Sequence, residues 1–532
     1  MREYAIGLDY GTGSVRASLV SMENGGELAT RVRPYSVMED ALPDGTPLKP
    51  RMSLADPMEY WQATIEVLRE VLLAAPKDDA CVRAIGVDAT TCTLLPTDAD
   101  GVPMCALERW HAEPSAYMKL WKSHSAEQEA RQIERHADAL DMPFMRRCGR
   151  KPSSEWLYPK ALETLHDAPA LFAEATYLVD ICDWIVWRLT GRLTRSYGGH
   201  SFKAFYGEEG LPSEDFWAQV ESGFAGINEK LAGPVLLWGE CAGELLPEVA
   251  EELGLSWPVV VAGGAPDGHV PMAALGLHRD GDMLLSVGTS NVFAIISDTW
   301  AEVRGICSSA KDALVPGFYG YDAGQAAVGD LFGWFVENCV PARYERKAEA
   351  TGESMHTLLS RLGFERAAKQ RDDLLALDWW NGNRSPLCRL DLSGVLTGLT
   401  LQTKAEDIYR ALVEATAFGA RSIVENFDAH GVSVGQIVLC GGIARKNPII
   451  VQCYADVLNR PLLVSTLSNA ASVGAAVIAA GCVEGMGGLE GAMRTMRSHD
   501  FLRYEPDPTR ARAYDAVYER FLALGGAMLE LQ

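Results

Sequence analysis

The sequence is short of positive charge, and this shortage excludes whole classes of partner. Lys and Arg number 48 against 71 Asp and Glu, which gives a formal net charge of −23 at pH 7. Nucleic acid and anionic lipid would be repelled over most of such a surface, so we expect neither as a partner. A ligand that carries phosphate must then be held locally, by backbone N–H groups, a metal ion or a few placed cations.

The sequence also lacks paired cysteines and long apolar runs. Its twelve cysteines are scattered without a C-x-x-C pair, which argues against a disulfide framework or a zinc site and favours buried, reduced thiols. No apolar run approaches the roughly 18 residues of a membrane span, and the start has no apolar signal segment. We therefore expect a soluble, cytoplasmic protein that acts on small molecules and does not contact membranes.

The length and the order of predicted elements indicate two α/β domains. A single hydrophobic core rarely grows beyond about 250–300 residues, whereas this chain has 532, of which 48 % are apolar. A second series of strands and helices begins near residue 255. We place an N-terminal domain over 1–257, a C-terminal domain over 258–500 and a helical tail over 501–532.

Each predicted domain contains a similar strand-turn-strand segment. Residues 4–10 and 15–20 are apolar, β-rich runs separated by a glycine-containing turn, and 282–297 repeats that arrangement. The pattern Gly-Thr-x-x-Val-x-Ala starts at Gly11 in the first segment and at Gly288 in the second. This weak internal repeat favours two related α/β halves that face one cleft.

Helical spacing fills much of the chain between these segments. It covers 55–75, with Ser53 as a candidate cap, and most of 113–190. A buried strand is predicted over 81–89. Gly191 follows the last of these helices, where a C-terminal cap is expected.

Two of the glycine-containing turns have the composition of a phosphate-binding turn. Asp9 ends the first predicted strand and a Gly-Thr-Gly turn follows it, so that N–H groups and a Thr hydroxyl can meet phosphate oxygens while the carboxylate positions a metal ion. Gly288-Thr289 repeats the device. Neither turn is a Walker loop or a G-x-G-x-x-G fingerprint. A plain hairpin turn is the alternative for each.

An acid follows the first strand of the second series, in the segment GGAPDGH. The glycines let the backbone approach a ligand, and the carboxylate of Asp267 could accept a proton from a sugar hydroxyl as that hydroxyl attacks phosphorus. The alternative is that Asp267 caps the helix expected after it.

A third glycine pair, Gly441-Gly442, follows the predicted strand IVLC. An adenine ring could lie flat against this backbone, with Lys446 and Asn447 at its edge. A plain tight turn is the alternative here too.

These motifs, in this order, resemble the FGGY carbohydrate kinases of the actin-like ATPase superfamily. The resemblance is carried by IGLDYGTGSVRA, GGAPDGH, GTSN and CGGIARKN. The segments LWKSHSA, SSEWLYPK and LDWWNGNRSP look most like the members that phosphorylate L-ribulose. The resemblance implies two ribonuclease-H-like domains around a central cleft, with ATP and Mg²⁺ as cofactors and a small sugar as substrate, and it leaves a homodimer open.

The resemblance also implies a role for each matching residue. Asp267 is then the catalytic base and, together with Asp9, organises Mg²⁺. The implied sugar-binding residues are Thr91, Lys203, Asp267 and Asp322, and the implied ATP-binding residues are Thr12, Gly13, Gly288, Thr289, Gly329, Gly442, Lys446 and Asn447.

The activity implied is ATP-dependent phosphorylation of a ketopentose at its terminal hydroxyl. The first candidate is the conversion of L-ribulose to L-ribulose 5-phosphate, a step of L-arabinose catabolism. Asp322 stands where such kinases usually carry Glu, and Ser123 where they carry Asp, so D-ribulose, xylulose, ribitol and a tetrulose stay open. A non-catalytic nucleotide switch on the same fold is the alternative of another class, and it would not need Asp267 as a base.

Overall fold

The computed structural model describes residues 2–76, 80–255, 257–369 and 373–531. The chain divides into two compact units, each assembled from three stretches of sequence. Unit 1 comprises Met1–His278, Ser308–Gly320 and Asn469–His499, and unit 2 comprises Arg279–Cys307, Tyr321–Ser468 and Asp500–Gln532.

The main sheet of unit 1 has the strand order β11-β12-β5-β1-β2-β3. β1 pairs with β2 in the antiparallel sense and with β5 in the parallel sense, so the predicted N-terminal hairpin is confirmed. A short strand, β13, pairs with the last residues of β5. The strands are β1 (Arg2–Tyr10), β2 (Ser14–Ser21), β3 (Glu27–Pro34), β5 (Ala80–Ala89), β11 (Cys241–Glu244), β12 (Val260–Ala262) and β13 (Ala265–Pro266).

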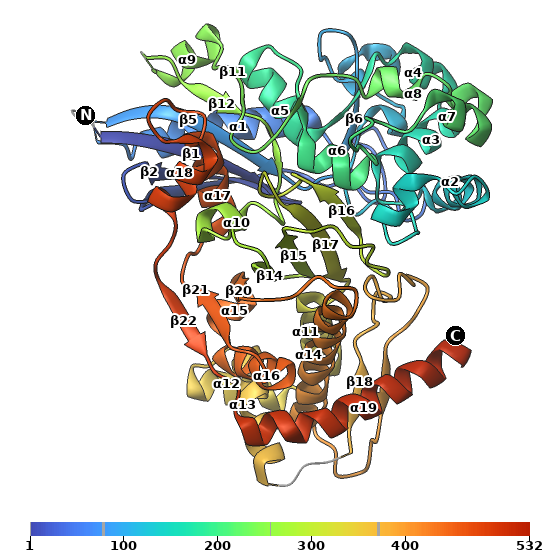
Figure 1. The fold of residues 1–532 in the computed structure, drawn as a ribbon, viewed down its shortest axis with the longest axis vertical. Helices are drawn as coiled ribbons and strands as arrows, with labels where there is room; N and C mark the ends of the chain where they lie inside the picture. Colours follow the sequence, from blue (N-terminus) through green and yellow to red (C-terminus); the bar gives the residue numbers. More distant parts are fainter. Residues whose placement is uncertain (1, 77–79, 256, 370–372, 532) are drawn as a thin grey trace. The chain divides into compact units, whose positions relative to one another are not determined.

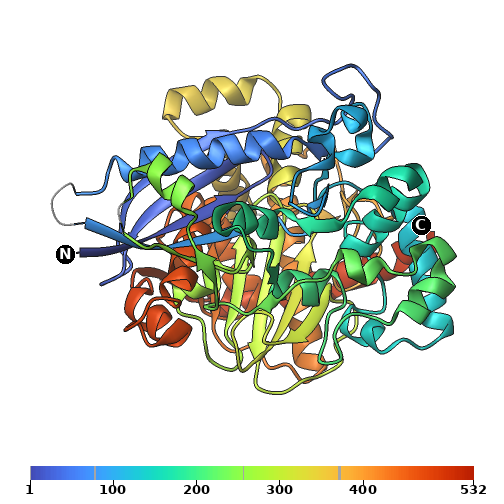
Figure 2. The ribbon, with the colours of Figure 1, turned by 90° about the horizontal axis from the view of Figure 1, so that it is seen from above.

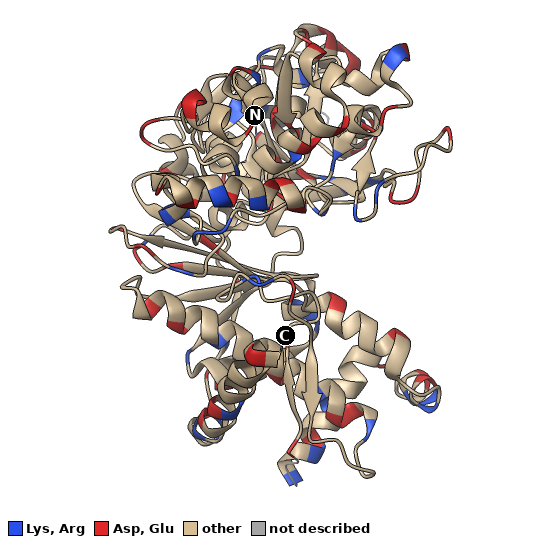
Figure 3. Cartoon of the chain, turned by 90° about the vertical axis from the view of Figure 1, so that its right-hand side faces the viewer, with Lys and Arg blue, Asp and Glu red and all other residues tan. Residues whose placement is uncertain are grey.

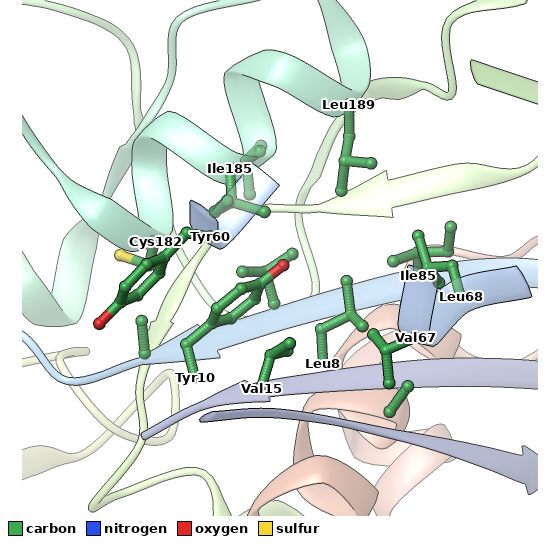
Figure 4. Close-up of a cluster of buried hydrophobic side chains, with 14 of the residues drawn as sticks. Leu8, Tyr10, Val15, Tyr60, Val67, Leu68, Ile85, Cys182, Ile185 and Leu189 are labelled. Carbon is green, nitrogen blue, oxygen red and sulfur yellow. The ribbon is translucent and has the colours of Figure 1, made fainter. Parts of the chain in front are cut away.

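One face of this sheet is apolar and is covered by helices. Because side chains alternate along a strand, Leu8, Tyr10 and Val15 point to the same side, where they join a buried cluster with residues of α1 (Pro57–Leu72) and α5 (Ile181–Thr190) (Figure 4). Figure 2 shows α1, in blue, lying across the blue strands. The face holds the hydrophobic core of unit 1.

The opposite face of the sheet carries glycines where α17 (Ala470–Ala480) crosses it. This helix comes from late in the sequence, yet it packs against β1 and β5 (Figure 1). A Cβ added to Gly7 would lie 1.6 Å from the carbonyl oxygen of Ser472, and one added to Gly86 would lie 2.0 Å from that of Ala475. Only glycine permits this approach of helix backbone to strand backbone.

The rest of unit 1 forms a second, largely helical part with a small sheet of order β4-β7-β6-β8. Its core is rich in aromatic rings, with Tyr158 stacked on Trp217 at 4.0 Å between ring centroids. Outside the main sheet, the strands of unit 1 are β4 (Leu54–Ala55), β6 (Leu94–Thr97), β7 (Met118–Lys119), β8 (Tyr177–Asp180), β9 (Arg195–Ser196), β10 (Val235–Leu236) and β16 (Ser308–Lys311). Besides α1, α5 and α17, the α-helices of unit 1 are α2 (Glu127–Ala139), α3 (Leu157–Asp167), α4 (Pro169–Glu174), α6 (Tyr197–Lys203), α7 (Glu214–Val220), α8 (Ile227–Lys230), α9 (Pro247–Leu253), α10 (Pro271–Leu275) and α18 (Gly488–Met496), of which α10 and α18 pack against α17.

Unit 2 repeats the local strand arrangement of unit 1. β14 pairs with β15 in the antiparallel sense and with β20 in the parallel sense, as β1 does with β2 and β5. The strands are β14 (Met283–Val287), β15 (Asn291–Ser297), β17 (Tyr319–Gln325), β18 (Leu375–Leu377), β19 (Val395–Thr397), β20 (Ile437–Cys440), β21 (Leu462–Ser465) and β22 (Phe501–Tyr504). The helices are α11 (Gly329–Cys339), α12 (Arg343–Thr351), α13 (Met355–Lys369), α14 (Ala405–Ala429), α15 (Gly442–Lys446), α16 (Pro448–Leu458) and α19 (Pro508–Leu531). The repeat predicted from sequence is therefore a repeat of structure.

The helix ends confirm one predicted cap and correct another. α5 ends at Gly191, which has a positive φ of 69°, as a C-terminal glycine cap requires. Ser53 does not cap α1. The cap is Asp56, whose carboxylate accepts a hydrogen bond from the N–H of Met58 at 2.8 Å.

The limits of the two units differ from the predicted domain limits of 1–257, 258–500 and 501–532. β12 lies after residue 257, yet it pairs with β5, and unit 1 continues to His278. Asp267 therefore belongs to unit 1 and not to the second domain. The predicted tail is part of unit 2, because β22 pairs with β21.

The expectations for cysteines, charges and membrane spans can be compared with the structure. All twelve cysteines are free, but Cys241 and Cys339 are exposed, so burial of the thiols holds only in part. Acidic and basic positions are interspersed along the helices in Figure 3. Within the described ranges, every helix is too short or too polar to cross a membrane.

Replacing Gly7 by alanine should destabilise unit 1. The new Cβ would force β1 away from α17, and overpacking of this kind costs about 1–3 kcal/mol or more. We expect the free energy of unfolding in urea to fall by at least about 2 kcal/mol, or no folded protein to accumulate. Gly526→Ala in α19 is the control, since a Cβ there meets nothing within 4 Å. Equal stability of both variants would show that the contact is not tight.

Candidate active site

Strand pairing brings three aspartates together in unit 1. Asp9 of β1 stands opposite Asp88 of β5, and Asp88 stands opposite Ala265 of β13 on its other side. Two residues further on, the N–H of Asp267 donates to the carbonyl of Ala89 at 3.0 Å. Residues that are far apart in the sequence are therefore fixed side by side by backbone hydrogen bonds.

Burial raises the pKa of all three carboxyl groups. For Asp88 the negative charges of Asp9 and Asp267 add to the desolvation. For Asp267, desolvation and the charge of Asp9 raise the pKa to about 7. Desolvation also dominates at Asp9, where Arg16 partly offsets it by donating to Oδ2 at 2.8 Å. So many buried like charges require a shared proton or a cation.

The donors of this cluster fit a divalent cation. Apart from the neighbouring carboxyl of Asp9, no group among the described residues hydrogen-bonds either buried oxygen of Asp88, and carboxylate oxygens are the ligands that Mg²⁺ prefers. Among all the residues that the structure describes, no three His, Cys, Asp or Glu side chains are arranged to enclose a metal ion. An ion here would therefore take one or two carboxylates and complete its shell with water and phosphate oxygens, as Mg²⁺ usually does.

Asp267 does not cap the helix that follows it. α10 begins at Pro271, and Val270 occupies its N-cap position without a side-chain cap. The Oδ1 atom of Asp267 accepts instead from the N–H of Gly268 at 2.7 Å. The capping alternative is therefore wrong, which favours the chemical interpretation of this carboxylate.

Two of the predicted sugar-binding residues lie near Asp267 in unit 1. α6 packs on the turn that contains Thr91, since a Cβ added to Gly199 would lie 3.9 Å from Thr91 Cγ2. Lys203 is the last residue of α6, and its charge lowers the pKa of Asp267, although desolvation is the larger effect. The structure thus brings Thr91, Lys203 and Asp267 into one neighbourhood.

Two further residues were singled out by the sequence, Asp322 as a sugar-binding residue and Ser123 as a departure from the ribulose-kinase pattern. Asp322 is buried in β17 of unit 2, so its place in a common site with Thr91 and Lys203 stays a prediction. Ser123 is buried in unit 1, where its hydroxyl accepts from the N–H of Ser53 at 3.3 Å. This contact gives Ser123 a structural role.

The turn with Thr12 and Gly13 joins β1 to β2 and is held by aromatic side chains. Tyr35 donates its hydroxyl to the carbonyl of Ser14 at 2.9 Å. The indole N–H of Trp121 donates to the Thr12 hydroxyl oxygen at 3.0 Å. Gly13 is exposed, so its backbone is accessible to a ligand.

The matching turn of unit 2 lies against the start of α11. The N–H of Gly329 donates to the carbonyl of Gly288 at 3.0 Å, and that of Val328 to the carbonyl of Thr289 at 2.9 Å. A Cβ added to Gly329 would lie 2.6 Å from the Gly288 oxygen. Gly288, Thr289 and Gly329, predicted as nucleotide contacts, are thus brought together.

The third glycine turn leads into two helices. Gly442 and Lys446 are the exposed ends of α15. Asn447 is buried and caps α16, accepting from the N–H of Ile450 at 3.4 Å and donating to the Ser360 hydroxyl at 2.9 Å. Its side chain therefore has a structural function, and its contact with a nucleotide stays a prediction.

Sequence reasoning missed a buried polar network next to the Gly288 turn. Asn291 donates to Gln325 at 2.7 Å, and Gln325 donates to Asp378 at the same distance. Burial raises the pKa of Asp378 to about 6. Asn291 and Asp378 lie in motifs noted above, but no spacing rule connects them with each other or with Gln325. Asp88 was likewise visible only as an acid near the end of an apolar strand.

Comparison with solved structures shows the fold, and the family models show the class of protein. The fold is that of the sugar kinases: a xylulose kinase from Rhodospirillum rubrum superimposes with a TM-score of 0.79 over 99 % of both chains, at 24 % identity. Residues 4–276 match the family model for the N-terminal domain of the FGGY family of carbohydrate kinases, and residues 283–481 match that for its C-terminal domain. The chain belongs to this family, and the resemblance seen in its motifs is confirmed.

Within this family, the chain is similar to curated ribulokinases over nearly its whole length. The chain is 39 % identical to a ribulokinase from Shouchella clausii, over 98 % of this chain and 95 % of that protein. It is 38 % identical to a ribulokinase from Halalkalibacterium halodurans, over 98 % of this chain and 94 % of that protein.

A buried histidine beside the site should make stability depend on pH. His200 lies one turn before Lys203 on α6, and burial, aided by the charge of Arg195, lowers its pKa to about 3. Below about pH 6.5 the unfolded chain binds a proton that the folded chain does not, which favours unfolding by up to about 1.4 kcal/mol per pH unit.

We therefore expect wild-type protein to lose stability, relative to His200→Gln, as the pH falls from 7.5 to 5. Urea unfolding at each pH measures the difference. Replacing the exposed His499 by Gln is the control and should leave the pH dependence of the wild type unchanged. A difference between wild type and His200→Gln that is constant with pH would contradict a buried, neutral His200.

Proposed function

We propose that this protein is an ATP-dependent kinase that phosphorylates the terminal hydroxyl of a ketopentose, converting L-ribulose to L-ribulose 5-phosphate. The observation that carries the proposal is Asp267, a half-buried carboxylate that does not cap a helix and whose raised pKa of about 7 suits a general base. Membership of the FGGY family and the similarity to ribulokinases support the choice of reaction and sugar.

In this reaction Asp267 accepts the proton of the attacking hydroxyl, and Lys203 and Thr91 orient the sugar. Asp9 and Asp267 would hold Mg²⁺. Asp88, which lies opposite Asp9 on the neighbouring strand, would add negative charge beside them. When bound, Mg²⁺ neutralises charge on the transferred phosphoryl group. The protein's own contribution is mainly positioning, which can supply a large part of the rate enhancement of a two-substrate reaction.

The proposed phosphate contacts are the Thr12 hydroxyl and the Gly13 backbone in unit 1, and Gly288 and Thr289 in unit 2. The proposed contacts along the nucleotide are Gly329, Gly442, Lys446 and Asn447. Backbone N–H groups and one exposed lysine meet the requirement that a strongly acidic chain bind phosphate by local devices.

A panel of sugars tests the choice of substrate. We expect L-ribulose to give the highest kcat/KM among L-ribulose, D-ribulose, xylulose, ribitol and a tetrulose in an assay coupled to ADP release. Asp322→Glu moves the carboxylate outward by about 1.5 Å, the length of one C–C bond, and should change the ranking if Asp322 contacts the sugar. The lowest kcat/KM for L-ribulose would contradict the proposal.

Replacing Asp267 tests the proposed base. We expect Asp267→Ala to lower kcat by about 10²–10⁴, the usual effect of losing a general base, while ATP affinity stays within a few-fold. Asp298→Ala, which removes an exposed carboxylate of the same length, is the control and should behave as wild type. Unchanged turnover in Asp267→Ala would overturn the assignment. A nucleotide switch would bind ATP in every variant and phosphorylate no sugar.

A further inference from the structure

We infer that Lys160 and Asp180 are positioning residues, which hold the turn after Thr91 in one strained conformation and connect it to the turn of Thr12. The inference rests on the proposed function, since it takes Thr91 as a contact of the sugar and Thr12 as a contact of the phosphates. Neither Lys160 nor Asp180 would touch a substrate.

The strain is located at Cys92, the residue after Thr91. Cys92 has a φ of 67°, in the left-handed region that favours glycine. Residues in such conformations persist only where the surrounding structure over-determines them, and they cluster at functional sites. The thiol itself is not reactive, because burial raises its pKa to about 12.

Two buried charged side chains hold the backbone of Cys92 from opposite ends. The N–H of Cys92 donates to the Asp180 carboxylate at 2.7 Å, and the ammonium of Lys160 donates to the Cys92 carbonyl at 2.6 Å. Lys160 is fully buried and Asp180 is 3 % exposed. Burial of charge is costly unless the group is well hydrogen-bonded, so these two groups indicate that the conformation of this residue matters.

Lys160 also holds a second segment, which leads to the Thr12 turn. Its ammonium donates to the carbonyl of Leu120 at 2.7 Å and to that of Trp121 at 3.4 Å. The indole of Trp121 then donates to the Thr12 hydroxyl. Because an indole only donates, the Thr12 oxygen must accept, and the Thr12 hydroxyl hydrogen stays available to a phosphate oxygen. One ammonium group therefore fixes both turns.

Asp180 holds one backbone segment and Lys160 holds two, so the two residues can be distinguished experimentally. The backbone N–H that Asp180 holds belongs to the turn after Thr91, whereas Lys160 holds that turn and the Trp121 segment. Loss of Asp180 should therefore affect the sugar alone, and loss of Lys160 should affect both the sugar and ATP.

The experiment measures KM for L-ribulose, KM for ATP and kcat in folded variants. We expect Asp180→Ala to raise the sugar KM about tenfold and to leave the ATP KM within about twofold. Asp180→Asn keeps a carbonyl oxygen that can accept the Cys92 N–H, so it should stay within about threefold of wild type in both. Lys160→Met should raise both KM values, by about tenfold for the sugar and several-fold for ATP.

The control is a buried ion pair elsewhere in the chain, Arg410–Glu414 in α14 of unit 2, whose atoms lie 2.5 Å apart. The double variant Arg410→Met/Glu414→Gln also removes buried charge, but it should change neither KM. Equal KM changes in this control would show a general effect of destabilisation and overturn the inference.

Unchanged KM values in Lys160→Met and Asp180→Ala would also overturn it, as would equal effects of Asp180→Ala and Asp180→Asn. If Lys160→Met yields no folded protein, the comparison of the two Asp180 variants decides. If wild-type protein phosphorylates no sugar of the panel, the proposed function fails, whereas active wild type with unaffected variants contradicts this inference alone.

Discussion

Three carboxylates that repel one another are held near the carboxyl ends of neighbouring strands in unit 1, and the packing around these strands keeps them there. The backbone pairing of β1, β5 and β13 places Asp9, Asp88 and Asp267 together and leaves them no freedom to separate. The apolar cluster on one face of the sheet and the glycine contacts of α17 on the other supply the packing that offsets this repulsion. Arg16 compensates part of the charge at Asp9, and a shared proton or a cation must balance the rest.

Buried polar groups also hold backbone turns in place in both units. Lys160 and Asp180 fix the turn after Thr91 in unit 1, and the chain of amide and carboxyl groups from Asn291 to Asp378 lies beside the Gly288 turn in unit 2. Each network buries polar groups whose hydrogen bonds fix the position of a backbone turn or of the residues beside it. In the turn after Thr91 this support allows a cysteine to keep a backbone conformation that usually needs glycine.

Local pattern was enough to predict much of the fold. The hairpin of β1 and β2, the helix α1 and the glycine cap at Gly191 follow from the spacing of apolar residues and from turn chemistry over a few positions. Asp267 was found because glycines and an acid follow a strand. The domain limit at 257 differed because a change in sequence composition does not reveal strand pairing, and β12 pairs with a strand that lies 176 residues earlier in the chain. Asp88 and Lys160 were missed for the same reason, since their partners lie on other elements.

The net negative charge of the chain does not by itself prevent binding of a phosphate-bearing ligand. A net charge of −23 would oppose an anionic nucleotide if the whole surface acted at once, but exposed charges beyond about 10 Å are largely screened at physiological salt. What matters is the local balance at each site. In the proposed reaction the carboxylates of unit 1 would disfavour a phosphate that arrives without a cation. The acid cluster would therefore favour the metal complex of a nucleotide over the free anion, and the backbone donors of the nearby Thr12 turn would bind its oxygens.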